Sequence, residues 1–156
     1  MKEFLTHTDF KNGYRIKYPA HWQKQALSPT MTGFFAPRES PADIFSENVN
    51  VGVEEASVTL DEHVDFQVTQ MQAVNLQLIR RSETRLADLP AQTLEFRGQL
   101  GPAMKHGRIE MVAMQWLQVY VLKDKRMYCL TYTAEPSAYD KYMPQVQEML
   151  TSLELS

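Results

Sequence analysis

The sequence predicts an α+β fold in which a central antiparallel β-sheet is sandwiched between helices. Most segments alternate apolar and polar residues with the period of a half-buried strand, and the links between them are short, which favours antiparallel order. Two segments carry apolar residues at helical spacing instead. One long strand is apolar on both of its faces, so the sheet should be covered on both sides.

The N-terminal part of the chain predicts a β-hairpin. Residues 4–10 and 14–18 are its two expected strands, and Asn12-Gly13 between them is a strong hairpin signal. The second strand stops at Pro19, whose nitrogen cannot donate to a β-ladder, and Trp22 follows as a large core anchor. This region therefore indicates a fold rather than an activity.

Two further strands enclose a long loop. We expect strands at residues 31–36 and 48–53, joined by an irregular loop over residues 37–48. The proline and serine content of the loop predicts exposure, and loops of this length are functional more often than short connections are. The loop residues that we expect to contact a partner protein are Pro37, Arg38, Pro41, Asp43 and Phe45.

The first helix should begin after Thr59. Glu62 follows Thr59 by three residues, which is the pattern of a capping box. Residues 76–86 and 89–98 then have the pattern of two strands around a turn. The helical residues that should face the sheet are Leu60, Val64, Val68 and Met71.

The longest pair of strands should lie at the centre of the sheet. The pair covers residues 107–122 and 126–133, joined by the turn Lys123-Asp124-Lys125. Lys123 and Lys125 in this turn are further candidates for partner contact. The first strand should be buried on both sides because Val112, Met114 and Trp116 lie on one face and Met111, Ala113 and Leu117 on the other.

The last helix is expected within residues 139–153. Its apolar stripe consists of Tyr142, Val146, Met149, Leu150 and Leu153. Pro144 conflicts with a helix interior, so the pattern predicts a helix that begins near Met143 with Pro144 in its first turn, after a separate turn at residues 137–142.

These segments, taken in order, resemble the PsbP-like family. The resemblance rests on Tyr18-Pro19-Ala20-His21-Trp22, on Asn48-Val49-Asn50-Val51 leading into a helix, and on the late run Tyr128 to Ala134 followed by Tyr139, Tyr142, Pro144 and Ser152-Leu153. It spans nearly the whole chain and implies a single domain over residues 1–156. The fold it implies is an antiparallel sheet between helices, a PsbP-like α/β/α sandwich.

The resemblance also implies a binding role. Members include the extrinsic PsbP subunit of photosystem II, a yeast Ran-binding protein, bacterial DcrB lipoproteins and adaptor chaperones of type VI secretion effectors, and they act by docking onto larger partners. The implied function is a non-catalytic protein-binding or assembly domain without a cofactor. The chain lacks the targeting peptide of the photosystem subunits, and their proposed metal ligands have no match here, so a photosynthetic role and a manganese or calcium site are not predicted.

Composition limits the remaining classes. The chain has 156 residues, enough for one domain with a sizeable core, and a net charge of −3, which argues against a nucleic-acid surface. No stretch approaches the length of a membrane span, and the start Met1-Lys2-Glu3-Phe4 lacks the apolar run of a signal peptide. The sequence as written predicts a cytoplasmic protein, whereas a removed leader would indicate the envelope or a lumen.

Motifs of catalysis are missing from the sequence. It contains no nucleophile elbow, no phosphate-binding loop, no His-Glu-x-x-His and no Cys-x-x-Cys, and its single cysteine, Cys129, is expected to be a buried thiol. The alternative hypothesis is a small-molecule or metal-binding module that uses His21, His63 or His106 with carboxylates. His63 lies close to the acidic residues Asp61, Glu62 and Asp65, but capping and solvation explain that cluster more simply.

Aromatic and methionine residues have two interpretations. The aromatic side chains expected in the core, with a ligand pocket as the alternative, are Trp22, Trp116, Tyr120, Tyr128 and Tyr132. Most of five methionines are expected inside the sheet layers, with an adaptable binding surface as the alternative, and these are Met104, Met111, Met114, Met127 and Met143.

Overall fold

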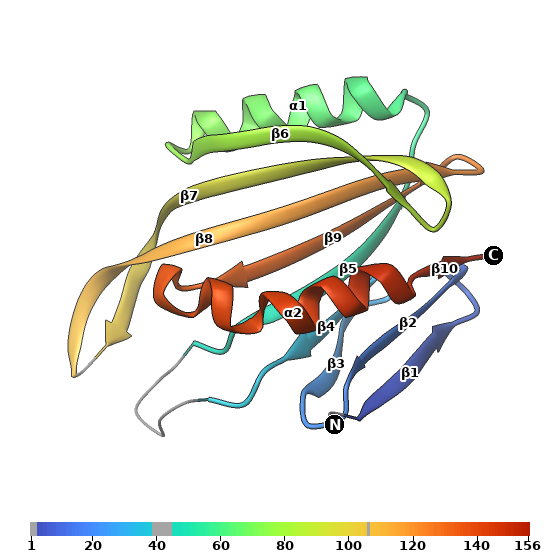
Figure 1. The fold of residues 1–156 in the computed structure, drawn as a ribbon. Helices are drawn as coiled ribbons and strands as arrows, with labels where there is room; N and C mark the ends of the chain where they lie inside the picture. The colour runs from blue at the N-terminus through green and yellow to red at the C-terminus, as the bar shows by residue number, and fades with distance from the viewer. Residues whose placement is uncertain (1–2, 39–44, 106) are drawn as a thin grey trace.

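The computed structural model describes residues 3–38, 45–105 and 107–156, and it contains two antiparallel sheets and two helices (Figure 1). The small sheet has the order β1-β2-β10, and the large sheet has the order β3-β4-β5-β9-β8-β7-β6. The N-terminal strands are β1 (Phe4–Asp9), β2 (Tyr14–Pro19), β3 (Gln23–Ser28), β4 (Met31–Phe35) and β5 (Asn48–Glu55). The later strands are β6 (Gln77–Leu86), β7 (Leu89–Lys105), β8 (Arg108–Lys123), β9 (Arg126–Ala134) and β10 (Glu154–Leu155).

The helices cover opposite faces of the large sheet, as the two-sided burial of its central strand predicted. Helix α1 (Leu60–Ala73) packs on β6, β7 and β8, and helix α2 (Pro136–Ser152) packs on β2, β8 and β9 (Figure 1). We call the two sides the α1 face and the α2 face. Side chains of β8 point alternately to the two faces. Tyr120 belongs to the hydrophobic cluster on the α1 face, whereas Val119 and Val121 belong to the cluster on the α2 face. This confirms the predicted sandwich.

Helix α1 begins where its sequence predicts. Thr59 is the N-cap, its hydroxyl accepts a hydrogen bond from the backbone N–H of Glu62 at 3.1 Å, and the Glu62 side chain accepts one from the Thr59 N–H. The capping box is therefore complete. Val64 is fully buried against Phe96 and Tyr120 on the sheet.

Helix α2 corrects the prediction for the last helix. It runs without interruption from Pro136 to Ser152, with Pro144 in its interior, so residues 137–142 are helical and not a separate turn. Pro136, not Pro144, occupies the first turn, where a missing N–H costs nothing. The buried side chains of Val146 and Met149 hold the helix on the sheet and offset the hydrogen bond that Pro144 removes.

Two strands have no strong pattern in the sequence. All six residues of β3 are exposed, so the strand shows no alternation and its pairing with β4 was not predicted. Strand β10 is two residues long and pairs with Tyr14 and Arg15 of β2. Both strands form because they pair with a neighbouring strand, and their own residues carry no strand pattern.

The hairpin of β7 and β8 is longer than the sequence predicted and extends beyond the rest of the sheet. β6 pairs with β7 only as far as Arg97, and β9 pairs with β8 only from Gln115 onward. The outer part, which we call the arm, consists of residues 98–105 of β7 and 108–114 of β8. Met111 and Ala113 are exposed there, so the expected burial on both faces holds only from Met114 inward.

Most of the expected core is confirmed. Trp22, Tyr120, Tyr128, Tyr132, Met114 and Met127 are buried, whereas Trp116 and Met143 are partly buried and the Met104 side chain lies outside the described structure. The Tyr128 hydroxyl donates to the backbone oxygen of Asn12 at 2.8 Å, which ties the first hairpin to the central strand β9. Among the described residues, no helix has the length and apolar content that crossing a membrane requires.

Candidate docking site

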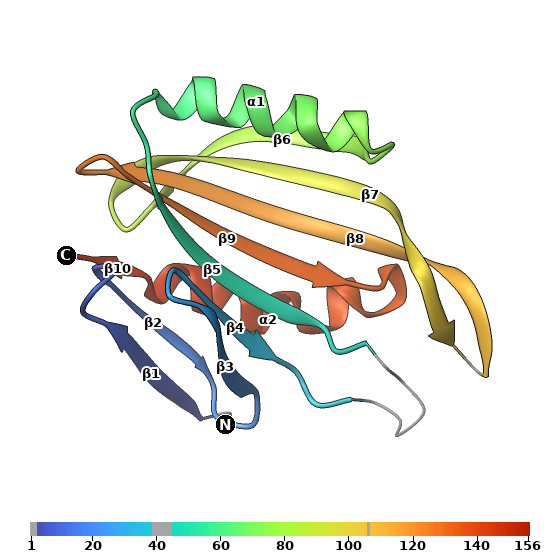
Figure 2. The same ribbon diagram turned by 180° about the vertical axis from the view of Figure 1, so that it is seen from behind.

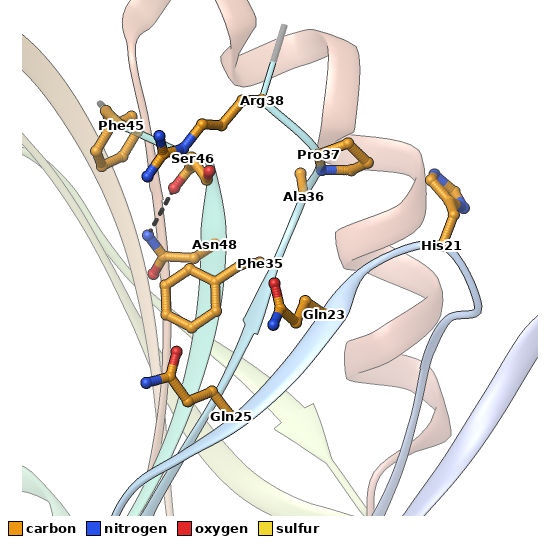
Figure 3. A pocket seen from close by; sticks show the side chains of 10 residues that line it. All are labelled: His21, Gln23, Gln25, Phe35, Ala36, Pro37, Arg38, Phe45, Ser46 and Asn48. Carbon is orange, nitrogen blue, oxygen red and sulfur yellow. Dashed lines mark hydrogen bonds between the residues drawn. The ribbon is translucent and has the colours of Figure 1, made fainter. Parts of the chain in front are cut away.

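A depression of about 670 Å³ lies at the end of the large sheet where β4 leaves it and β5 enters it (Figure 3). We call it the docking pocket. It opens between the edge strand β3 and the two ends of the loop that joins β4 to β5. The lining residues are His21, Gln23, Gln25, Phe35, Ala36, Pro37, Arg38, Phe45, Ser46 and Asn48.

The strand register places three of these side chains in one row. Gln23 of β3 lies opposite Phe35 of β4, and Phe35 lies opposite Asn48 of β5, so all three project from the α1 face (Figure 3). The Phe35 ring leans over Gly33, because a Cβ at Gly33 would lie 2.7 Å from that ring. The absence of a side chain at Gly33 thus leaves room for the Phe35 ring.

A polar row continues from the pocket across the uncovered part of the sheet. Helix α1 lies over β6, β7 and β8 and, apart from His63 beside Glu54 at one end of β5, leaves this side of β3, β4 and β5 uncovered among the described residues (Figure 2). Register aligns Gln25, Gly33, Asn50, Thr131 and Gln118 across five strands. The Asn50 Oδ1 is buried and has no hydrogen-bond partner among the described residues. Polar side chains therefore line this row, and Gln25 at its outer edge is exposed.

The described lining of the docking pocket differs in charge sign from the whole chain. Arg38 is the single side chain with a fixed charge among the described lining residues, and no carboxylate lines the pocket there. The chain as a whole carries −3. An exposed guanidinium beside amides and partly exposed phenyl rings suits a partner segment that presents a carboxylate and backbone amides.

The structure brings together three of the residues predicted to contact a partner. Pro37, Arg38 and Phe45 line the docking pocket, whereas Pro41 and Asp43 lie outside the described residues. Lys123 and Lys125 lie elsewhere. Residue 48 of β5 pairs with 133 and residue 55 pairs with 126, so the turn that holds both lysines is at the other end of β5, about 23 Å away.

Local bonds involve the two lysines of that turn. The Lys123 ammonium donates to the backbone oxygen of Leu155 at 3.1 Å, and the Lys125 backbone oxygen accepts from the Ala56 N–H at 2.8 Å. Lys125 is exposed and Lys123 is partly buried. A single small contact patch cannot include both this turn and the docking pocket, so partner contact at Lys125 stays a separate, untested prediction.

Sequence reasoning missed the strand side of the pocket. Gln23 and Gln25 come from β3, which has no apolar alternation to reveal it, and His21 was considered only as a candidate metal or small-molecule ligand. One signal was available. Asn48 and Asn50 alternate with Val49 and Val51, which indicates a strand whose second face is polar and therefore available to a ligand.

The described histidines do not gather with several carboxylates into one metal site. His63 lies 3.5 Å from Glu54 and packs on the ring of Tyr120, while Asp61 and Asp65 both contact Arg81. The part of the chain that the structure describes contains no group of three or more metal-ligating side chains. His106 lies outside that part.

A second depression, of about 230 Å³, surrounds Cys129. The thiol is partly buried, lies 3.5 Å from the Thr131 hydroxyl, and has its pKa raised by burial. The neighbouring Tyr120 hydroxyl donates to Gln118 at 2.8 Å, and burial raises the pKa of this phenol as well. Both groups are neutral near pH 7, which is the opposite of an activated nucleophile.

The family model named PsbP matches residues 2–155 of the chain. Solved structures with the same fold include the cyanobacterial PsbP (CyanoP) of Synechocystis sp. PCC 6803, with 17% identity, a TM-score of 0.67, and coverage of 100% of this chain and 94% of that one. The Saccharomyces cerevisiae Ran-binding protein Mog1p has 10% identity and a TM-score of 0.66, with 99% and 96% of the two chains covered.

A third similar structure is LpqN of Mycobacterium tuberculosis, described as involved in cell envelope biogenesis. It has 12% identity and a TM-score of 0.63, with 99% of this chain and 91% of that chain covered. No curated protein sequence matches the chain. Identities this low show a shared fold and nothing finer, whereas the family match extends over almost every residue. The chain therefore belongs to the PsbP family.

Proposed function

We propose that this chain is a non-catalytic docking domain that binds a larger protein through the docking pocket. The observation that carries the proposal is the convergence of Pro37, Arg38 and Phe45 with the amides of β3 beside a strand face that α1 leaves uncovered. Arg38 has no carboxylate partner among the described residues. An acidic side chain of a partner would pair with it, while the amides would bind the partner's backbone.

The relatives support a protein partner. Mog1p, which shares the fold over 96% of its length, is described as a Ran-binding protein. That description concerns Mog1p alone, and at 10% identity it supports the class of function and not the identity of the partner. An adaptor or assembly role for this chain is consistent with the fold.

Site-specific photocrosslinking tests the proposal. A photoreactive amino acid at position 37 of the full chain, where the exposed Pro37 lines the pocket and Arg38 is kept, should crosslink to one predominant protein in extract from the source cells. The control position is 66, because Phe66 on α1 is 58% exposed and lies away from the pocket. Phe45→Asp should abolish the crosslink from position 37, because the carboxylate would repel the acidic partner segment. Equal crosslinking from positions 37 and 66, or none from position 37, would contradict the proposal.

A further inference from the structure

A larger depression, of about 760 Å³, lies on the α2 face of the molecule. We call it the helix-side pocket. Strands β6, β7 and β8 form its floor, and helix α2 forms one wall. Its volume lies within the range of about 300–1,000 Å³ that is typical of small-molecule sites.

The strand register places a charged pair on the floor of this pocket. Arg80 of β6 lies opposite Glu95 of β7, which in turn lies opposite Leu117 of β8. Leu117 belongs to the hydrophobic cluster on the α2 face, so Arg80 and Glu95 point to that face as well.

Helix α2 contributes a buried hydroxyl beside this pair. Tyr139 lines the pocket and is 7% exposed, and its ring stacks on that of Tyr132 with a centroid distance of 5.1 Å. Its Oη is buried and has no hydrogen-bond partner among the described residues. Burial, followed by the charge of Glu95, raises the pKa of Tyr139 to about 12, so the phenol keeps its proton near pH 7. Because buried polar groups nearly always have a partner, this O–H marks a position for an acceptor group of a ligand.

The charged pair is loosely engaged. The Arg80 Nε lies 3.9 Å from the Glu95 Oε2, which is beyond hydrogen-bond distance. The Glu95 side chain is 21% exposed and the Arg80 side chain is 67% exposed, so a ligand can reach both. The other charged lining residues are exposed, and solvent screens them: Glu83, Arg85, Asp88 and Asp140.

Apolar side chains complete the pocket. Leu117 and Val119 of the floor are buried, and Met143 and Leu150 of α2 are partly buried beside them. A simple carboxylate in this pocket would meet Glu95 as a like charge, and a simple amine would meet Arg80 as a like charge. A ligand that carries both charges and an apolar group matches the whole lining.

We propose that the helix-side pocket binds a free α-amino acid with an apolar side chain. Its carboxylate accepts hydrogen bonds from the Arg80 guanidinium and the Tyr139 O–H, and its ammonium donates to the Glu95 carboxylate. Its side chain lies against Met143 and Leu150. Binding involves no covalent step. The inference goes beyond the docking role and does not rest on it, because the two pockets share no lining residue.

NMR titration of the isotope-labelled full chain tests the class of ligand. The probes are L-leucine, L-methionine and L-phenylalanine, and at least one should produce saturable shifts in the amide signals around Tyr139 and Glu95. The amide derivative of that amino acid lacks the carboxylate, and its des-amino acid lacks the ammonium, so each should bind about tenfold or more weakly. Equal binding of either analogue would overturn the proposal, as would the absence of saturable shifts with all three probes at about 10 mM.

Two conservative variants test the contacts. Tyr139→Phe keeps the ring and removes the hydroxyl, and Glu95→Gln removes the charge, so each should weaken binding by about tenfold or more. Glu148→Gln is the matched control, because Glu148 is exposed on α2 and does not line the pocket. Tyr139→Phe should fold normally, since the Tyr139 hydroxyl has no hydrogen bond to lose among the described residues, and the amide spectrum of the variant checks this.

Unchanged affinity in both pocket variants, or an equal loss in Glu148→Gln, would overturn the proposal. None of these variants changes the docking pocket, so the two proposals fail independently.

Discussion

At the scale of single residues, the structure shows which buried polar groups have a hydrogen-bond partner within the described chain and which do not. The Tyr128 and Tyr132 hydroxyls, both buried, donate to backbone oxygens at 2.8 Å, so these tyrosines serve the core and not a ligand pocket. Asn50 in the uncovered polar row has an amide oxygen without a partner among the described residues. A buried polar group without a partner costs about 1–3 kcal/mol.

His7 gives the fold a dependence on pH. Its ring packs edge-on against Tyr14 and Phe34, and burial, followed by the nearby Lys24, lowers its pKa below the ordinary value of 6.5. The unfolded chain therefore takes up this proton first, so the free energy of unfolding should fall as pH drops from 6.5 through the lower folded pKa.

Urea titrations at pH 7.5 and 5.5 measure this effect. His7→Phe keeps an aromatic ring and removes the titrating group, so the variant should lose less stability than the wild type between the two conditions. An identical loss in both proteins would assign the pH dependence to other groups.

At the scale of elements, local sequence signals predicted the first helix and tertiary packing decided the second. The capping box at Thr59 marked the start of α1 because its hydrogen bonds are made by neighbours in sequence. Pro144 suggested a break in α2, but the burial of Tyr142, Val146 and Met149 comes from contacts with strands far away in the chain. Strand β3 shows the same limit, since exposed residues such as Gln23 and Gln25 carry no period.

The cap of α1 should contribute measurably to stability. Thr59→Ala removes the acceptor for the Glu62 N–H and should lower the free energy of unfolding by about 1 kcal/mol. Thr69→Ala is the control on the same helix, because the Thr69 hydroxyl donates to the Asp65 backbone oxygen in mid-helix and its loss should cost little. Urea denaturation compares the two, and equal effects would contradict a special role for the cap.

Replacing the interior proline of α2 should stabilise the protein. Pro144→Ala restores the backbone N–H in a helix that is already continuous and should raise the free energy of unfolding by about 1–2 kcal/mol, after the gain in unfolded-state entropy is deducted. Pro136→Ala, in the first turn, should not stabilise. Thermal unfolding of both variants decides the matter, and a lower melting temperature for Pro144→Ala would show that the helix depends on the proline.

At the scale of the whole molecule, the sequence predicted the sandwich and the family because both depend on the order of strong patterns along the chain. It predicted only the loop side of the docking pocket. Pro37, Arg38 and Phe45 stood out by composition, whereas Gln23, Gln25 and Asn48 join them only through the register of β3, β4 and β5. The same register separates that pocket from Lys125 by the length of β5.

The docking pocket and the turn with Lys125 lie at opposite ends of β5, and this separation provides the most direct test of the central claim, that a larger protein docks at the pocket. Once photocrosslinking has identified the partner, its affinity for Arg38→Glu and for Lys125→Glu is measured by titration against the wild type. Both variants change the chain by the same charge, but at opposite ends of β5. Docking at the pocket predicts a loss of about tenfold or more for Arg38→Glu and little change for Lys125→Glu. The reverse pattern, or equal losses, would contradict it.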